Sequence, residues 1–353
     1  TGASAVFGES LVPAYVLAYR NNPNLKWETV TSKEFGFEMA TLKNRLNLEV
    51  NYYDKTTEDL LTFVQLGNEK FYVNAGEISN KGFEFAASWK DKITDDFNYS
   101  ISGNLTTIKN KVNAVYTDGF EVFDGPTRLS AGNPIGAFYG YEVEGVYQSY
   151  ADILNSPIST LGSYDVGDLK FKDINGDGII DANDRKTIGN PTPDISYGFA
   201  VNLNYKNFSL SADFQGVYGN EIWRDWGNGS TFAQFNYRTD RLNAWNGPGT
   251  SNWEPRLNDA SGYNTNNRST YMIEDGSYLR LRNIQLGYNF NADFLSKLNI
   301  SSLRLYLSAQ NIVTWSNSSG FTPENGGSPT KFGIDTGGYP LPAITSLGLN
   351  VTF

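Results

Sequence analysis

The sequence predicts an all-β fold, namely the carboxyl-terminal part of an antiparallel transmembrane β-barrel with about nine strands and long extracellular loops. Three observations support this prediction. Apolar and polar residues alternate along many short segments, as they do in a strand with two unlike faces. The connections between these segments are alternately short and long. No stretch approaches the ~18 apolar residues of a membrane-spanning helix, so strands would have to cross the membrane.

The alternation is clearest in residues 197–205 and 208–215, which are typical of an antiparallel hairpin with a tight turn. Residues 35–40 and 46–52 form a second pair of the same kind. No segment shows a convincing helical pattern. The remaining predicted strands, which bring the number to nine, are 83–89, 97–105, 284–290, 303–309 and 347–353.

One predicted strand changes phase along its length. Leu279 and Leu281 are odd-numbered, whereas the apolar positions from Ile284 onward are even-numbered. A slip of one residue exchanges the two faces of a strand, so we expect a β-bulge near Asn283. The alternative is that Leu279 and Leu281 point inward above the membrane.

The connections distinguish one end of the predicted sheet from the other. The short ones are 43–45, about 90–96, 206–207 and about 291–302. The long ones are about 55–79, 110–193, 219–276 and 314–343. Outer-membrane barrels have short periplasmic turns and long external loops, whereas a soluble sandwich has no reason to separate them in this way.

Aromatic residues lie at strand ends beside the short turns, where a membrane-interface girdle is expected. They are Trp89, Phe97, Tyr205, Phe208 and Phe290. The polar residues of each strand would then face a wet lumen. A soluble antiparallel sheet with one buried face is the alternative interpretation of the alternation taken alone.

The composition of the chain excludes several function classes. The 353 residues alone would suggest two domains, but a large β architecture can use this length as one unit. Without Cys or His there is no thiol nucleophile, Ser–His triad or conventional zinc site. The net charge of −10 argues against a nucleic-acid partner. No carboxylates occur in a setting that marks an acid/base pair, so we do not expect an enzyme.

Several short motifs occur in order along nearly the whole chain. Two longer ones are Gly167-Asp168-Leu169-Lys170-Phe171-Lys172-Asp173 and Asp275-Gly276-Ser277-Tyr278-Leu279-Arg280-Leu281-Arg282-Asn283. The others are Asn24-Leu25-Lys26-Trp27-Glu28, Phe35-Gly36-Phe37-Glu38, Asn44-Arg45-Leu46, Tyr52-Tyr53-Asp54-Lys55-Thr56, Asp59-Leu60-Leu61, Gly132-Asn133-Pro134-Ile135-Gly136 and Phe138-Tyr139-Gly140-Tyr141. In these motifs the sequence resembles the final portion of SusC/RagA-type TonB-dependent transporters.

The resemblance implies import of nutrients, either glycan or oligopeptide, across the cell outer membrane. Such transporters are barrels of about 22 strands with a plugged lumen. A SusD-like surface lipoprotein covers the barrel mouth as a lid, and the inner-membrane TonB system pulls on the plug. The plug domain and the TonB-contacting segment have no counterpart here. Residues 1–353 are therefore interpreted as the carboxyl-terminal portion of a larger transporter, which would contact the lid lipoprotein, the TonB system, the lipid bilayer and the remaining strands and plug.

Residues 173–184, within the long loop 110–193, match the spacing of a calcium-binding loop. Calcium takes six to eight oxygen ligands, and Gly178 permits the sharp turn that lets them converge. No flanking helix pair is evident, so a structural clip is expected rather than a sensor. The alternative is an Asp/Gly/Asn-rich turn without metal. The predicted calcium ligands are Asp173, Asn175, Asp177, the backbone carbonyl of Ile179, Asp181 and Asp184.

The long loop 219–276 is rich in aromatic residues. In a polar context such side chains can stack on sugar rings or form hot spots against a partner lipoprotein. They can equally pack the loop into a small core of its own. The candidate contact residues are Trp223, Trp226, Tyr237, Trp245 and Trp253. A mixed-charge group in the same loop is interpreted as solvated pairing, and its members are Arg224, Asp225, Arg238, Asp240 and Arg241.

Two other functions are compatible with the same pattern. The first is a structural or adhesive β-protein of the cell surface that binds glycans without transporting them. The second is a barrel that serves as a docking component of a secretion or motility assembly. A protein that folds in solution without detergent would favour the first, and copurification with a SusD-like lipoprotein would argue against the second.

Overall fold

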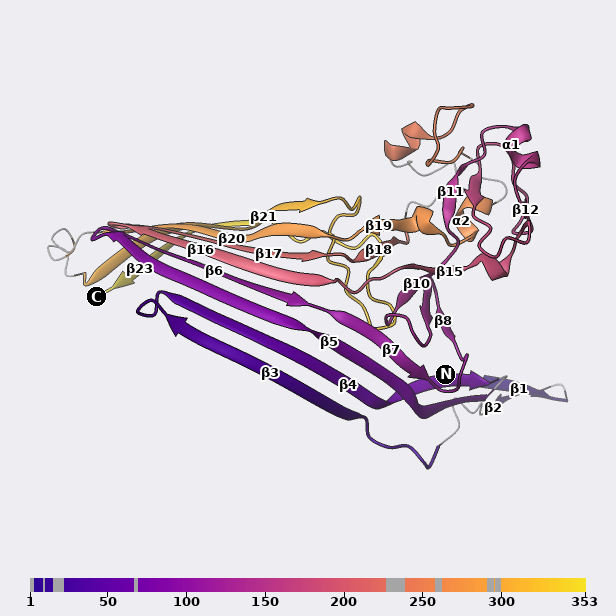
Figure 1. Ribbon diagram of the computed structural model, residues 1–353, viewed down its shortest axis with the longest axis horizontal. Helices are drawn as coiled ribbons and strands as arrows, with labels where there is room; N and C mark the ends of the chain where they lie inside the picture. Colours follow the sequence, from indigo (N-terminus) through magenta and orange to yellow (C-terminus); the bar gives the residue numbers. More distant parts are fainter. Residues whose placement is uncertain are drawn as a thin grey trace.

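A large curved antiparallel sheet dominates the fold (Figure 1). The computed structural model describes residues 3–8, 10–14, 22–66, 69–226, 239–257, 262–290, 295 and 300–353. The strand order is β23-β21-β20-β17-β16-β6-β5-β4-β3, with β7 alongside β5. These strands are β3 (Thr29–Thr41), β4 (Leu46–Leu66), β5 (Glu69–Thr94), β6 (Phe97–Thr107), β7 (Lys109–Val115), β16 (Ile195–Tyr205), β17 (Phe208–Tyr218), β20 (Tyr278–Asn289), β21 (Ser302–Ser316) and β23 (Ile344–Thr352). All nine predicted strands lie in this sheet, so the predicted all-β fold is confirmed.

The segregation of short and long connections is also confirmed, with one exception. The turns after β3, β5 and β16 lie at one end of the sheet, and the long connections lie at the other (Figure 1). The predicted long loop at about 55–79 is wrong, because β4 and β5 continue as one hairpin to residues 66 and 69. The pairing shifts between Thr57 and Leu60, and Asp59 has a positive φ of 57°. This irregularity interrupts the alternation, so the strands could not be followed past it from the sequence.

Smaller elements form in the long connections. One sheet contains β8 (Val122–Asp124), β9 (Thr127–Leu129), β10 (Ala137–Gly140) and β15 (Lys186–Gly189). Three further sheets are β11 (Val143–Val146) with β13 (Leu169–Phe171), β12 (Ile158–Ser159) with β14 (Ile179–Ile180), and β18 (Glu221–Arg224) with β19 (Ile273–Asp275) and β22 (Ile334–Asp335). Near the N-terminus, β1 (Ala3–Phe7) pairs with β2 (Ser10–Ala14).

The expectation of no helix is wrong for two single turns, α1 (Tyr150–Leu154) and α2 (Tyr263–Asn266). Three short 3₁₀ turns also form, at Ala182–Asp184, Thr239–Asn243 and Thr270–Met272. Segments this short cannot display a helical period in the sequence. No helix in the described ranges is long and apolar enough to cross a membrane.

The outer face of the large sheet is apolar. Residues paired directly across neighbouring strands lie on the same face, so the register defines rows that run across the sheet. One outer row consists of Met39, Leu48, Ala87, Gly103, Phe199, Phe214, Leu281 and Val313. Another consists of Tyr99, Leu203, Leu210, Leu286, Leu307 and Leu347. Leu286 and Leu347 are 48% and 74% exposed, which is the state expected of side chains that face lipid.

The concave face carries the intervening polar residues. One of its rows consists of Asn47, Ser88, Ser102, Ala200, Asp213, Asn283 and Gln310. Neighbouring polar side chains bond across the strands: the Asn47 amide donates to Ser88 Oγ at 3.2 Å, and the Asn202 amide donates to Ser100 Oγ at 3.3 Å. The polar lumen expected from the sequence therefore corresponds to this face.

Aromatic residues mark two levels of the outer face. Near the short turns, Tyr205 pairs with Phe97 and Phe208, and Phe208 packs on Tyr288 with a ring distance of 4.7 Å. This is the predicted girdle. A second row, which was not expected from the sequence, contains Phe35, Tyr52 and Phe83 nearer the long loops. The strands continue beyond this second row, so no strand end marked its position in the sequence.

The predicted bulge is confirmed at Arg282, next to Asn283. Asp213 pairs with Asn283 but the next residue, Phe214, pairs with Leu281, which leaves Arg282 as the additional residue. Leu281 therefore shares an outer row with Phe214. The alternative of inward-pointing leucines is wrong.

Arginine at the two adjacent alanines Ala86 and Ala87 should distinguish the two faces. Ala87 lies in an outer row near the middle of the apolar band, and Ala86, the preceding residue of the strand, lies in the polar row of Glu49 and Asn104 on the concave face. We expect Ala87→Arg to lower the free energy of unfolding by about 2–4 kcal/mol, the usual effect of a cation at the bilayer midplane. The measurement is urea unfolding in lipid vesicles, followed by tryptophan fluorescence.

Ala86→Arg is the matched control and should have a much smaller effect, because its side chain enters a polar space. Equal destabilisation by the two variants would contradict the assignment of the faces.

Candidate functional site: the concave face and the loop body

A cavity of about 1100 Å³ lies against the concave face of the sheet. Its lining includes Glu38, Glu49, Asn104, Asp213 and Gln215. Glu38 and Glu49 are direct cross-strand partners. Two like charges in this position are unfavourable unless water or a counter-charge screens them. The wall is thus suited to a hydrated passage.

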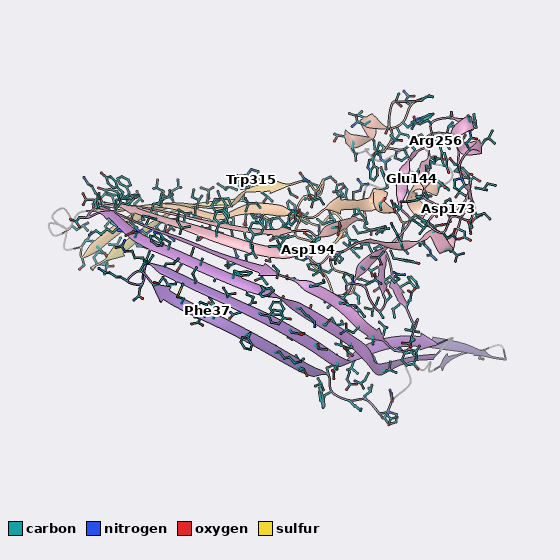
Figure 2. All side chains as sticks on the ribbon, in the orientation of Figure 1. Phe37, Glu144, Asp173, Asp194, Arg256 and Trp315 are labelled. Atoms are coloured by element: carbon teal, nitrogen blue, oxygen red, sulfur yellow. The ribbon has the colours of Figure 1, made fainter. Side chains whose placement is uncertain are left out.

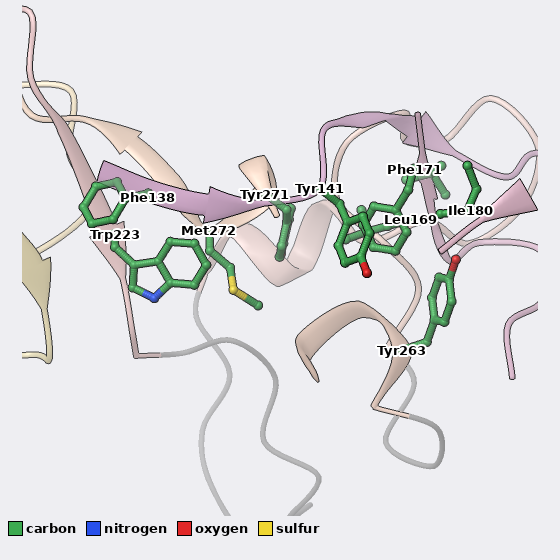
Figure 3. Packing of buried hydrophobic residues seen from close by; sticks show 10 residues of the cluster. Phe138, Tyr141, Leu169, Phe171, Ile180, Trp223, Tyr263, Tyr271 and Met272 are labelled. Atoms are coloured by element: carbon green, nitrogen blue, oxygen red, sulfur yellow. The ribbon is translucent and has the colours of Figure 1, made fainter. Parts of the chain in front are cut away.

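The long connections fold together into one unit, which we call the loop body: the described residues within 116–194, 219–277 and 317–343. Its core combines both large predicted loops (Figure 3). The buried core residues are Phe138, Tyr141, Val146, Leu169, Phe171, Ile180, Trp223, Tyr263, Tyr271 and Met272. Because they come from 110–193 and 219–276 alike, neither loop folds as a separate unit.

A buried ion pair joins these two loops. Asp168 is fully buried and accepts two hydrogen bonds from Arg256, from Nε at 3.0 Å and from Nη2 at 2.9 Å. The Asn264 amide also donates to Asp168 at 2.9 Å. The hydrogen bond to the Asp168 carboxylate raises the pKa of Arg256. A buried carboxylate is tolerated only when it is paired and hydrogen-bonded in this way.

Two glycines of the motifs allow the loops to approach each other. At Gly140, an added Cβ would lie 2.2 Å from the Arg268 carbonyl oxygen, close to the point where Tyr141 N donates to that oxygen at 2.9 Å. At Gly167, where φ is +89°, an added Cβ would lie 2.4 Å from the ring of Trp245. Only glycine fits such positions.

The predicted aromatic contact residues have different environments. Trp223 is 2% exposed and packs on Phe138, so it takes the packing role that the sequence left open. Trp245 is half-buried and donates to Gln148 Oε1 at 3.2 Å. Trp226 is half-buried and stacks on Phe321. Trp253 is 49% exposed, and Tyr237 lies outside the described residues.

The interpretation of the mixed-charge group as solvated is wrong for Arg224 and Arg241, which are 5% and 8% exposed. Arg241 Nη1 lies 2.9 Å from Glu254 Oε1, and Arg224 Nη1 lies 3.3 Å from Glu274 Oε1. Burial raises the pKa of Glu254. Glu254 and Glu274 lie outside the mixed-charge group, and the burial of both arginines depends on how the loop folds, so the local pattern could not reveal it. Arg238 lies outside the described residues.

A cavity of about 370 Å³ adjoins these charges. Its lining includes Arg224, Asp240, Glu254, Tyr271 and Trp253. It combines both signs of charge with an exposed aromatic ring, a chemistry suited to a polar ligand.

The predicted calcium loop is closed by its own hydrogen bonds. Asp173 accepts from the backbone N–H groups of Gly176 and Gly178, at 2.6 and 2.8 Å. Asp184 is fully buried and accepts from Ile174 N and Asp181 N, each at 2.8 Å. Within the described residues, no group of three or more His, Cys, Asp and Glu side chains is placed to hold a metal ion.

The remaining predicted ligands lie on the surface of this loop. Asn175 and Asp177 are exposed. Strand β14 bonds to β12 through the carbonyls of Gly178 and Ile180, so the Ile179 carbonyl points away from that partner. Asp181 accepts from Asn183 N at 2.7 Å.

Comparison with known proteins identifies the family. The model of the TonB dependent receptor-like β-barrel matches residues 3–312. The chain belongs to this family. It is 36% identical to "TonB-dependent receptor P3" of Formosa agariphila, over 99% of the chain and 36% of that protein. It is 29% identical to "TonB-dependent receptor SusC" of Bacteroides thetaiotaomicron, over 94% of the chain and 32% of that protein.

The fold matches that of a chain in the solved "Structure of the RagAB peptide transporter". The TM-score is 0.79 at 22% sequence identity, and the match covers 100% of this chain and 38% of that chain. The chain thus spans about a third of the length of these proteins. The resemblance to SusC/RagA-type barrels is confirmed, and the protein is one of the outer membrane.

Removing the charge of Asp168 should loosen the loop body without affecting the sheet. We expect Asp168→Asn to destabilise the loop body by about 2–3 kcal/mol, because the fully buried side chain at position 168 loses its charge-assisted hydrogen bonds to Arg256. Hydrogen exchange at residues 147–169, measured by mass spectrometry, reports this loss.

Asp165→Asn is the control, because the Asp165 carboxylate is only partly buried and lies farther from Arg256, at 3.6 Å. Unchanged exchange in the Asp168 variant would show that the ion pair does not hold the two loops together.

Proposed function

We propose that this chain forms part of the barrel wall and the external loops of a TonB-dependent importer of nutrients, either glycan or oligopeptide. The observation that carries the proposal is the contrast between the two faces of one sheet. An apolar face suits lipid, and a polar concave face with a large cavity suits a hydrated passage.

The edges of the sheet support a larger barrel. Strands β3 and β23 each pair on one side only among the described residues. An open edge is not tolerated in the hydrocarbon of a membrane. Further strands are therefore expected to close the barrel, in agreement with relatives that are about three times as long.

The names of the relatives support the energy source and the direction of transport. Two relatives are named TonB-dependent receptors, and the structural neighbours are named a peptide transporter and a peptide importer. By analogy, a TonB system would drive import and a SusD-like lipoprotein would cover the loop body. Trp253 and the cavity of about 370 Å³ beside it offer a contact point for substrate or lid. We further propose a conduit rather than an enzyme.

Deletion of the gene should abolish growth on one class of polymer, oligosaccharide or oligopeptide, as sole carbon source. Growth on the corresponding monomers should be unchanged, because these pass through general porins. Uptake of a fluorescent oligomer should also stop when a protonophore collapses the energy supply to TonB.

The outcomes separate the alternatives. A protein that is folded and soluble without detergent would instead be a structural or adhesive surface protein. Normal growth of the deletion strain, with copurification of secretion or motility components, would favour a docking role.

We also propose that residues 173–184 bind calcium as a structural clip. The half-buried Asp173, the exposed Asn175 and Asp177, and the Ile179 carbonyl that points away from β12 support this proposal. Each carboxylate oxygen that accepts one N–H retains a further lone pair. Asp184 would contribute mainly by holding the loop closed, because its side chain is fully buried and bonded to the backbone N–H groups of Ile174 and Asp181.

Calcium should raise the melting temperature of the loop body, and Asp177→Ala should remove this effect. Asp184→Asn, in contrast, should lower the melting temperature with or without calcium. Calorimetry in calcium and in a chelator measures both. Equal melting of the unmodified protein in the two buffers would contradict the calcium proposal.

A further inference from the structure

A row of lysines crosses the outer face of the large sheet near the long loops. Lys33 on β3 pairs with Asp54 on β4, Asp54 pairs with Lys81 on β5, and Lys81 pairs with Lys109 on β7. Lys111 lies on the same face one step further along β7, paired with Ser79. We call Lys33, Lys81, Lys109 and Lys111 the basic row.

The basic row lies directly above the upper aromatic row. Lys33 is two residues from Phe35, and Lys81 is two residues from Phe83, so each lysine shares the outer face with its aromatic neighbour. From Phe97 in the lower girdle to Lys109 the chain rises about 40 Å along the strand, or about 30 Å along the membrane normal at a tilt of about 40°. This span matches the hydrocarbon thickness of a bilayer.

The basic row is a local exception in an acidic chain. The net charge of the chain is −10, and the lysines of the row are exposed. Two carboxylates lie beside the basic row: Asp54 already pairs with Lys81 at 2.9 Å, and Glu77 accepts from the Asn113 amide at 2.8 Å. Among the described residues, no carboxylate forms an ion pair with Lys33, Lys109 or Lys111. The outward rows on the other described strands of the sheet, β6, β16, β17, β20, β21 and β23, contain no lysine.

We propose that the basic row binds the phosphorylated headgroup of a lipid in the outer leaflet of the membrane. Its lysines lie at headgroup height above an apolar surface, so one molecule can contact both regions. Acyl chains would cover Phe35, Phe37 and Phe83, which are 84%, 59% and 46% exposed (Phe37 is labelled in Figure 2). The phosphate would neutralise the positive charges of Lys33, Lys109 and Lys111, which form no ion pair with a carboxylate among the described residues.

The continuity of these two surfaces selects a lipid over a free anion. Free phosphate would contact only the lysines, which lie on different strands and are therefore separated by the spacing between strands. A phosphorylated lipid gains the apolar surface as well. Each lysine near an anionic membrane surface strengthens binding about fivefold, so three of them should contribute on the order of 100-fold.

The test titrates the detergent-purified protein with phosphorylated lipid A and measures bound lipid by native mass spectrometry. The triple variant Lys33→Gln, Lys109→Gln, Lys111→Gln should bind on the order of 100-fold more weakly. The corresponding triple Lys→Arg variant should bind normally. Dephosphorylated lipid A should bind all forms weakly, and excess inorganic phosphate should not displace the bound lipid.

The matched control is Lys55→Gln, Lys90→Gln, Lys92→Gln, which removes the same charge from the concave face of the neighbouring strands β4 and β5. It should bind lipid A as the unmodified protein does. Equal binding by the two glutamine triples, or full displacement by phosphate, would overturn the proposal. Failure of the arginine variant to bind would overturn it as well. Heat-modifiable migration on gels checks that each variant is folded, and nutrient uptake is a separate readout that this inference does not require.

Discussion

Every backbone N–H and C=O group inside a bilayer has to find its partner within the protein, because the hydrocarbon offers none. The continuous pairing from β3 to β23 meets this requirement through the interior of the sheet. The same pairing fixes the two faces, since a slip of one residue would exchange them. The apolar rows, the aromatic levels and the polar wall are therefore consequences of one register. Within the described part of the sheet, only the edge strands β3 and β23 have backbone groups that need partners on further strands.

Outside the membrane a different constraint applies. Water can satisfy the hydrogen-bonding groups of a loop, but it cannot hold the loop in one conformation. The loop body is ordered by its own core and by Asp168, whose burial is tolerated only through its bonds to Arg256 and Asn264. The residues on either side of Asp168 contribute to the same contact between the two loops. Gly167 leaves room for Trp245, and Leu169 packs in the core. The motif Gly167-Asp168-Leu169 thus encodes a junction between two loops that are far apart in sequence.

The sequence predicts what is local. Strand alternation needs only neighbouring residues, so the nine strands, the short turns and the bulge could all be found. The continuation of β4 past Asp59 could not, because the irregular pairing there breaks the alternation. The burial of Trp223 and Arg241 depends on partners such as Phe138 and Glu254, which the fold brings from elsewhere. No periodic pattern records such long-range contacts.

The bulge at Arg282 connects the wall to the loops. Below it the even-numbered residues of β20 face lipid, and above it Leu279 and Leu281 do so instead. This exchange turns Arg280 to the concave side, where it is 5% exposed and forms an ion pair with Glu324 of the last long connection. Tyr278 donates to the same carboxylate at 2.6 Å. A strand without the additional residue would place either these polar groups or the leucines on the wrong face. A single inserted residue thus lets one strand present apolar residues to lipid along its whole length, while Arg280 on the opposite face contacts the loop body.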